Sequence, residues 1–202
     1  MSRTGRVIGA VIIAGAFGAA PLAAQRAGSQ RLGLGVGLLA PSGDFHVDQA
    51  GDGFNMGWQG LLFLQLGSRR GPLGTRLEVS YSQNGVNDHS DAELSAELGQ
   101  PVDASIHLLT GSFNLTLGSP QTRGTGVYAL GGVGLCRATL SAKSGGLTAD
   151  TTQNAFAWNV GAGVTRGGAR IAPFMEARYR HVASVFDGPS LPYFVVSAGM
   201  RF

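Results

Sequence analysis

Charged side chains recur at every second position in several stretches of this 202-residue sequence. Glu176, Arg178 and Arg180 follow one another in this way, and so do Arg76 and Glu78. A spacing of two places side chains on one face of an extended strand, and a guanidinium group offers forked N–H donors that match a carboxylate. These residues therefore predict ion pairing inside the fold, with each glutamate between arginines. The full predicted network comprises Arg76, Glu78, Arg137, Glu176, Arg178, Arg180 and Arg201.

Other reactive groups do not form a recognisable site. Asp44, Asp48 and Asp52 are evenly spaced, but the ligand order of a calcium-binding EF-hand is absent. Cys136 is the only cysteine, so it offers neither an internal disulfide nor a CxxC pair. The sequence contains no glycine-rich phosphate loop and no basic patch typical of DNA binding. It thus predicts no metal, no cofactor and no nucleic-acid partner.

The elements that position the charged residues are strands. Eight segments alternate between apolar and polar residues with a period of two, and long polar loops alternate with short turns between them. In the fifth segment this reading puts Tyr128, Leu130, Cys136 and Leu140 on the apolar face, opposite Arg137. The predicted strands are 31–40, 53–66, 73–83, 104–117, 125–141, 151–166, 169–182 and 191–202, with 142–150 as a loop and Gly167-Gly168 as a two-residue hairpin turn.

The first 24 residues have the pattern of a secretory signal. Arg3 and Arg6 precede an apolar run over residues 7–20, and small residues lead up to Ala24. A membrane-spanning helix is the alternative, but residues 7–24 are barely long enough to cross about 30 Å of hydrocarbon. We therefore predict a secretory signal peptide of residues 1–24, cleaved after Ala24, and one mature domain of residues 25–202.

The composition of this domain points to a membrane. Only 13% of the residues are charged and 33 of 202 are glycine, an unusual balance for a water-soluble protein. A soluble eight-stranded barrel would turn its apolar face inward around a ligand. Here the polar face carries long charged side chains of both signs, and the lumen of eight strands is just wide enough for side chains to fill. The apolar face is expected to meet lipid and the charged face to form a plug, with a charged channel lining as the alternative.

The last strand carries the clearest family signal. Residues 191–202 read LPYFVVSAGMRF and place Phe194, Val196, Met200 and Phe202 on one face. This pattern resembles the closing strand of small bacterial outer-membrane barrels of the OmpA/OmpX type. The resemblance implies an all-β fold, an eight-stranded antiparallel up-and-down transmembrane β-barrel in the cell outer membrane. It also implies that the assembly machinery recognises Phe202, that the partners are outer-membrane lipids and lipopolysaccharide, and that the role is not enzymatic.

A second resemblance offers an enzymatic alternative. The segment from Arg178 to Ser184 looks somewhat like the His-x-Ser segment of outer-membrane lipid A deacylases, in which His acts as base for a Ser nucleophile and a carboxylate orients the His. Here Ser184 lies three residues after His181, and Ala183 occupies the position that the motif requires. A separation of three points the two side chains to opposite faces of a strand. Only Asp187 follows as an acid.

The charges also predict an orientation. Ten of the 12 acids fall in the longer loops, whereas the short turns are rich in arginine. Long loops face the exterior and short turns the periplasm in such barrels, so the outer rim should be acidic.

We predict a structural or surface-interaction role through loops 41–52 and 84–103, with a ligand that the sequence does not identify. A narrow passive pore is a further alternative. The predicted interfacial aromatic residues are Trp58, Tyr81, Trp158, Tyr179 and Phe194 at the outer rim, and Tyr128 and Phe202 at the inner rim.

Overall fold

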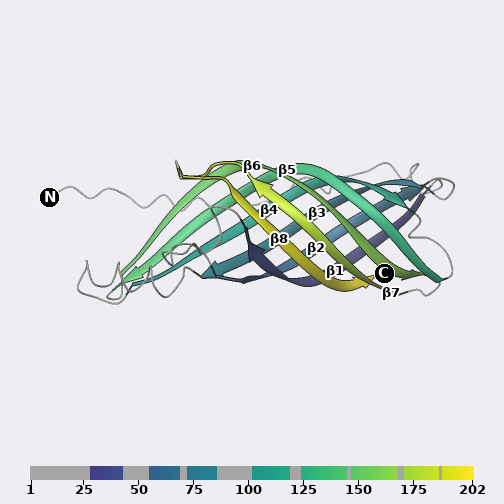
Figure 1. The fold of residues 1–202 in the computed structure, drawn as a ribbon, viewed down its shortest axis with the longest axis horizontal. Helices are drawn as coiled ribbons and strands as arrows, with labels where there is room; N and C mark the ends of the chain where they lie inside the picture. The colour runs from purple at the N-terminus through teal and green to yellow at the C-terminus, as the bar shows by residue number, and fades with distance from the viewer. Residues whose placement is uncertain are drawn as a thin grey trace.

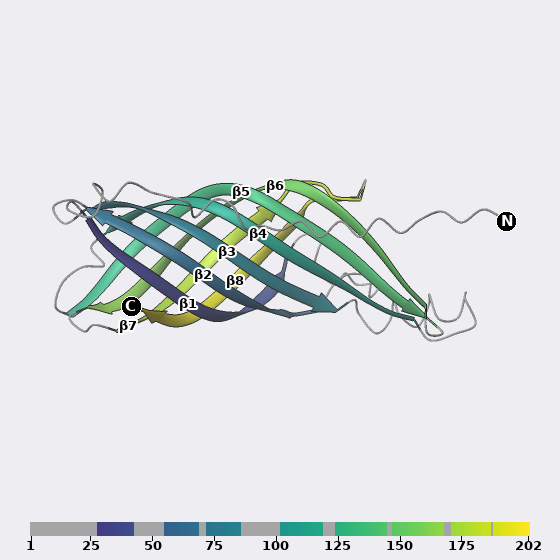
Figure 2. The same ribbon diagram turned by 180° about the vertical axis from the view of Figure 1, so that it is seen from behind.

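The computed structural model is a closed barrel of eight antiparallel strands, paired in the order β1 to β8 with β8 returning to β1 (Figures 1 and 2). The strands are β1 (Gly28–Pro41), β2 (Gly57–Ser68), β3 (Leu73–Gly85), β4 (Val102–Gly118), β5 (Gly124–Ser144), β6 (Leu147–Gly167), β7 (Ala172–Val182) and β8 (Leu191–Arg201). The described residues are 28–42, 55–68, 72–85, 102–118, 124–144, 147–167, 171–186 and 188–202. Among them no helix could cross a membrane.

The predicted fold class is confirmed, because all eight predicted strands exist and close into one up-and-down barrel. The predicted signal peptide lies outside the described residues. β2, β4, β6 and β8 end at the same end of the barrel as the carboxyl terminus, which we call the inner end (Figure 1). The opposite end, where β1, β3, β5 and β7 finish, is called the outer end.

The β5–β6 hairpin is longer than the rest of the barrel. Each of its strands has 21 residues, and Ser144 pairs directly with Leu147. The predicted loop 142–150 is therefore wrong: strand pairing continues through it and leaves only Gly145 and Gly146 between the strands. Paired glycines suit such a two-residue connection. The turn predicted at Gly167-Gly168 is also misplaced, since Gly167 pairs with Gly124 inside β6.

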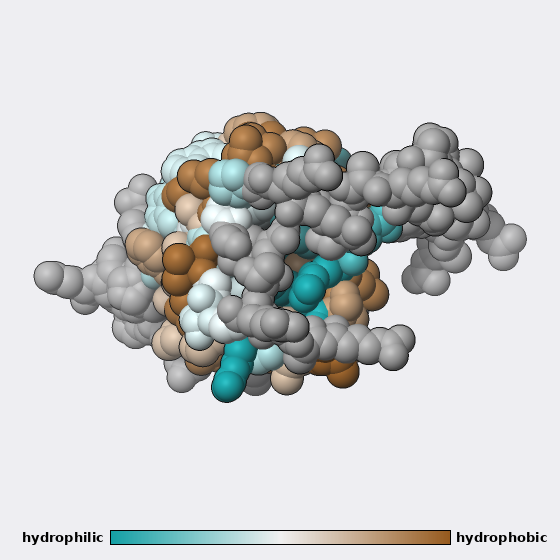
Figure 3. Space-filling view, turned by 90° about the vertical axis from the view of Figure 1, so that its right-hand side faces the viewer, coloured by the Kyte–Doolittle hydropathy of each residue, from teal (hydrophilic) through white to brown (hydrophobic). Residues whose placement is uncertain are grey.

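The outer surface of the barrel is apolar. Large hydrophobic side chains point outward on every strand, among them Leu34, Val79, Phe113 and Met200, each about half exposed. Figure 3 views the inner end, where hydrophobic residues lie along the flank of the barrel and hydrophilic residues gather nearer the mouth. A water-soluble protein rarely exposes so much contiguous apolar surface. The polarity is that of a barrel surrounded by lipid.

A substitution at Val160 tests this polarity. Val160 lies in the middle of β6 with 52% of its surface exposed. Val160 pairs with Tyr179, so it faces lipid between the outer aromatic side chains and the bilayer midplane. Replacing it with arginine should lower stability in phospholipid vesicles, by up to the roughly 2–4 kcal/mol that a charge costs at the midplane itself. The measurement is reversible urea unfolding followed by tryptophan fluorescence. Thr152→Arg is the matched control, since Thr152 is exposed on the same strand near the outer end and should change stability little.

Close strand contact in the lumen depends on glycine. A Cβ on Gly33 would lie 2.1 Å from Cζ of Phe63, so the bare backbone of β1 makes room for this ring. At Gly199 a Cβ would lie 2.0 Å from the carbonyl oxygen of Leu34, where β8 meets β1. The barrel is closed at that seam only because residue 199 has no side chain.

The two faces of β5 are the reverse of the prediction. In β5 the side chains of Tyr128, Leu130 and Cys136 are buried in the lumen, whereas Arg137 is exposed on the outer surface. The prediction that Arg137 belongs to the interior network is therefore wrong. The physical reason is that both faces of β5 are apolar over most of their length, so the period of two did not distinguish them.

Candidate functional site

A cluster of five buried ionic side chains crosses the lumen. Glu78 and Arg76 come from β3, and Glu176, Arg178 and Arg180 come from β7. In a closed ring of eight strands, β3 and β7 are four positions apart and so face each other across the barrel. Alternation along each strand turns these side chains inward, as the sequence spacing predicted.

Arg178 is the centre of the cluster. Its Nη1 and Nη2 donate to the two carboxylate oxygens of Glu78, both at 2.8 Å. Its Nε donates to Oε2 of Glu176 at 2.8 Å, and Nη2 donates to the same oxygen. This forked arrangement uses the planar guanidinium to hold two carboxylates at once.

The other two arginines complete the contacts of the carboxylates. Arg76 lies 2.8 Å from Oε2 of Glu78 through Nη2 and bonds Oε1 of Glu176 through Nη1. Arg180 donates to Glu78 through Nη2 and to the hydroxyl of Ser80 through Nη1, the latter at 2.6 Å. Every glutamate oxygen in the cluster thus accepts from a donor.

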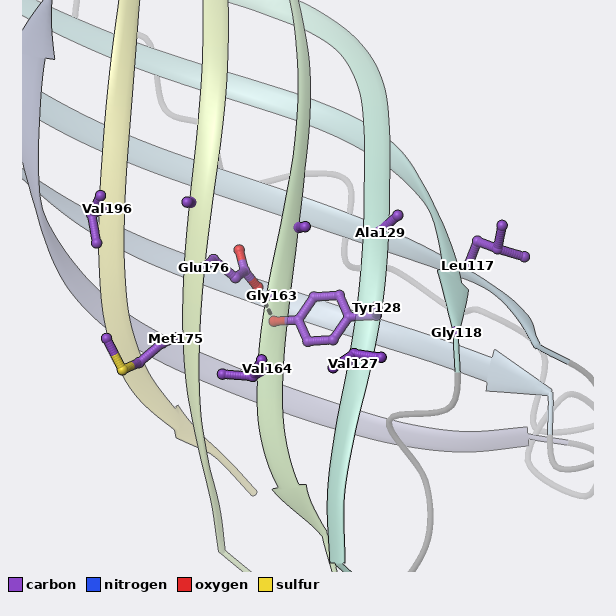
Figure 4. Close-up of a pocket in the computed structure, with 12 residues that line it drawn as sticks. Leu117, Gly118, Val127, Tyr128, Ala129, Gly163, Val164, Met175, Glu176 and Val196 are labelled. Atoms are coloured by element: carbon purple, nitrogen blue, oxygen red, sulfur yellow. Dashed lines mark hydrogen bonds between the residues drawn. The ribbon is translucent and has the colours of Figure 1, made fainter.

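Tyr128 is a further member of this cluster, which the sequence pattern did not predict. Its hydroxyl donates to Oε1 of Glu176, as the dashed line in Figure 4 shows. The predicted position of Tyr128 at the inner membrane interface is wrong, since the side chain is only 6% exposed and points into the lumen. Gly163 makes room for the contact, because a Cβ there would lie 2.6 Å from the tyrosine hydroxyl.

The cluster is sealed from water. Side chains of Arg76, Glu78, Glu176, Arg178 and Arg180 are between 0 and 4% exposed. Toward the inner end the guanidinium carbon of Arg76 lies 3.3 Å from the centre of the Phe63 ring, and Phe63 packs edge-on against Phe174 at 5.4 Å. A buried arrangement in which every carboxylate oxygen accepts from a donor favours a structural plug, since no member is left accessible to a substrate.

The outer part of the lumen contains an apolar cluster, next to buried polar side chains such as Gln59, Ser82 and Asn84. The buried residues of the cluster come from the outer ends of the strands: Leu39, Ile106, Leu108, Cys136, Ala138, Ala155, Ala157, Val182, Val185, Leu191, Tyr193 and Val195. Val185, in the connection between β7 and β8, is 3% exposed, and Phe186 packs against the same cluster with a positive φ of 56°. The connection thus folds over the outer end of this apolar cluster.

The residues of the enzymatic alternative are not brought together. His181 faces outward and stacks on Trp158 with ring centres 5.5 Å apart. Ser184 is exposed beyond the end of β7, and no hydrogen bond joins it to His181 among the described residues. Asp187 lies outside those residues.

No group of three or more His, Cys, Asp or Glu within the described ranges could hold a metal ion. Asp44, Asp48 and Asp52 lie outside these ranges.

His181 belongs instead to an aromatic belt near the outer end. Trp58 packs against Tyr81 at 5.6 Å on one side of the barrel, and Tyr179 contacts both Trp158 and Phe194 on the other, at 5.5 and 5.2 Å. Tyr81 also shares a hydrogen bond of 2.8 Å with Nδ1 of His107. Amphipathic rings of this kind gather where hydrocarbon gives way to head groups.

The two remaining predicted site residues lie at the carboxyl end. Arg201 is 2% exposed, with its guanidinium 5.6 Å from the ring centre of Tyr128, but it takes no part in the ion pairs of the cluster. Phe202 is 49% exposed on the outer surface, and its N–H donates to the carbonyl of Leu32 at 2.8 Å. The recognition of Phe202 by the assembly machinery stays a proposal.

Comparison with known families decides the classification. The family described as the outer membrane protein beta-barrel domain matches residues 10–202. The chain belongs to this family. It is therefore a protein of the cell outer membrane, as predicted. No curated protein matches the chain.

Solved structures show the same fold at low sequence identity. Neisserial surface protein A is 15% identical with a TM-score of 0.57, and the match covers 86% of this chain and 97% of that one. A major outer membrane protein from Thermus thermophilus is 10% identical with a TM-score of 0.56, covering 86% and 100%. Ail of Yersinia pestis, in complex with the heparin analogue sucrose octasulfate, is 13% identical with a TM-score of 0.51, covering 86% and 99%.

Proposed function

We propose that this outer-membrane barrel is a closed, non-catalytic scaffold that acts through its extracellular surface. The observation that carries the proposal is the filled lumen. Ion pairs join β3 to β7 across the barrel, and an apolar cluster occupies the outer part of the lumen. A lumen filled in this way supports neither a passive pore nor an internal active site.

The outer surface argues against the deacylase-like alternative as well. The imidazole of His181 is stacked on Trp158, and its separation from Ser184 leaves no nucleophile within hydrogen-bond distance, which general-base activation requires. The described residues therefore support an interaction role over a hydrolytic one.

The chemistry of the outer end points to a cationic partner. Ten acids lie in the sequence segments that join strands there or at the outer ends of strands, against only two bases, Arg137 and Lys143. Such an excess raises the local concentration of cations and repels polyanions. The sucrose octasulfate bound to Ail is a polyanion, which an acidic surface would repel. We therefore do not transfer that ligand to this chain. Basic proteins or peptides, and divalent cations that link these acids to lipopolysaccharide phosphates, fit better.

The β5–β6 hairpin supplies a rigid part of this surface. Beyond the aromatic belt it is polar, with a hydroxyl contact of 3.1 Å between Thr139 and Thr152, and residues 148–154 are exposed on both faces. A paired ribbon keeps its backbone hydrogen bonds while it projects from the barrel (Figure 1). It can therefore present side chains to a partner at a fixed distance from the membrane.

The proposal is tested with the barrel in nanodiscs and a fluorescent hexalysine peptide as the probe. Binding should weaken steeply with salt, and neutralising Asp88, Asp91, Glu93 and Glu97 to their amides should reduce it at least tenfold, since steering follows charge. Arg166→Gln, at the inner end, is the control and should leave binding unchanged. Planar bilayers containing the protein should show no unitary conductance. Stronger binding of heparin than of hexalysine, or regular conductance steps, would contradict the proposal.

Two further proposals follow from the family. We propose that residues 1–24 direct export and are cleaved after Ala24, leaving residues 25–202 in the membrane. We also propose that the basic inner rim rests on anionic phospholipid head groups, which attract arginine near the membrane surface.

A further inference from the structure

Two arginines near the inner end lack an acidic partner. Arg201 is 2% exposed, yet its Nε and Nη2 make no hydrogen bond in the described part of the barrel. Arg31 is half-buried, and its Nη1 is also buried without a hydrogen-bond partner there. None of the ion pairs formed by the described residues involves either side chain. Arg201 contacts the ring of Tyr128, but a buried guanidinium without an anionic partner is costly.

The neighbouring chain segments do not supply the missing negative charge. Among the described residues, Glu78 and Glu176 are the only glutamates inside the barrel, and three arginines already share them. The inner connections 69–71, 119–123 and 168–170 contain no Asp or Glu, and neither does the sequence before Asp44. The inner end is therefore positive in its lumen as well as on its rim.

The two guanidinium groups are placed to converge. Arg201 on β8 lies opposite Gly33 of β1, and Arg31 is two residues further along β1 on the same inward face. Such a diagonal pair has backbones about 7–8 Å apart. Gln65 lies opposite Arg31 on β2, and its amide is held by donation to the hydroxyl of Thr116 at 2.8 Å. Gln65 thus adds a polar side chain next to Arg31 on the neighbouring strand.

We propose that Arg31 and Arg201 form an oxyanion-binding site at the inner mouth of the barrel. Phosphate or carboxylate oxygens would accept from the unused N–H groups, a geometry that guanidinium recognises with two parallel bonds. Arg31 is less buried than Arg201 and is the side chain nearer the opening. The oxyanion comes either from a free periplasmic solute or from the phosphate of an inner-leaflet lipid.

The test for a free anion uses the refolded full chain in octyl glucoside micelles, which contain no phosphate. Sodium phosphate should raise the melting temperature by about 2–4 °C over sodium chloride at equal ionic strength, the shift expected for modest binding in a chain of this size. Arg31→Gln and Arg201→Gln should each abolish the difference. Arg166→Gln should retain it, because Arg166 is exposed on the outer face at the same end. Equal melting in both salts, with no response to lipid phosphate, would overturn the proposal.

Side-chain NMR of the wild-type protein keeps the test independent of whether each variant folds. Titration with inorganic phosphate should shift the Nε resonances of Arg31 and Arg201 saturably and leave those of Arg166 unchanged. In nanodiscs of phosphatidylglycerol, shifted resonances before any phosphate is added would identify the lipid as the source. Resonances that shift only when phosphate is added would identify the free anion. Resonances insensitive to both would refute the site.

Discussion

Replacing Glu176 with leucine should lower the free energy of unfolding by about 3–5 kcal/mol. Glu176 accepts from Arg76, Arg178 and Tyr128 in a lumen where its own side chain is fully buried. Without it, Glu78 alone would face three guanidinium groups, so two positive charges would remain buried and uncompensated. Urea unfolding of the barrel in phospholipid vesicles, followed by tryptophan fluorescence, measures the change.

Two variants identify the cause of this loss. Glu176→Gln keeps the size and one acceptor oxygen but removes the charge, so a loss close to that of leucine would assign the effect to charge. Arg137→Leu removes an arginine that is exposed on the outer surface and should alter stability by less than about 1 kcal/mol. If Arg137→Leu were as damaging as Glu176→Leu, the proposed interior network would be incorrectly assigned.

Replacing Gly199 with valine should prevent the barrel from closing. A Cβ at this position would lie 2.0 Å from the carbonyl oxygen of Leu34 and 2.6 Å from the Cα of Gly35. Because both atoms belong to the backbone of β1, neither can rotate away. Separating β8 from β1 would expose unpaired N–H and C=O groups to hydrocarbon, where each costs several kcal/mol. The expected result is loss of the heat-modifiable band in gel electrophoresis after refolding.

Gly111 provides the matched control for this substitution. A Cβ on Gly111 would meet no atom within 4 Å, and the residue is exposed on β4. Gly111→Val should therefore fold with normal yield. Normal folding of Gly199→Val would show that the β1–β8 seam is looser than the structure indicates.

Much of the barrel could be predicted because the membrane imposes a simple rule on each strand. In seven strands the row of side chains that faces lipid is apolar, and the row that faces the lumen has a different composition. A period of two therefore shows which face is which. Glu176, Arg178 and Arg180 could be placed in the lumen by the same rule, since long charged side chains cannot face hydrocarbon mid-strand.

The rule fails where the lumen is itself apolar. Cys136 and Ala138 of β5 point into the outer apolar cluster, so the inward row resembles the outward one. Arg137 can be exposed there because its neighbour across the strands, Leu109, lies at the level of Tyr81 in the aromatic belt. Arg137 thus faces the head-group region and not the hydrocarbon, and its charge carried no information about the lumen.

Two other features could be recognised only from the register of the strands. Gly145-Gly146 is a glycine pair like Gly167-Gly168 in the sequence, but only the pairing of Ser144 with Leu147 shows which pair lies between two strands. The hydrogen bond of Tyr128 to Glu176 joins residues 48 positions apart, and no local pattern predicts it. That Arg201 lacks an acidic partner is likewise visible only once the other arginines have been matched to their glutamates.

The ion pairs between β3 and β7 also affect how the barrel deforms. They join strands at opposite ends of one diameter, whereas the perpendicular diameter, between β1 and β5, has no ion pair among the described residues. Stiffness should therefore be anisotropic. When lateral pressure in the bilayer changes, the cross-section would become elliptical. The ion pairs of Glu78 and Glu176 would resist change along the β3–β7 diameter, so one axis of the ellipse would lie along it.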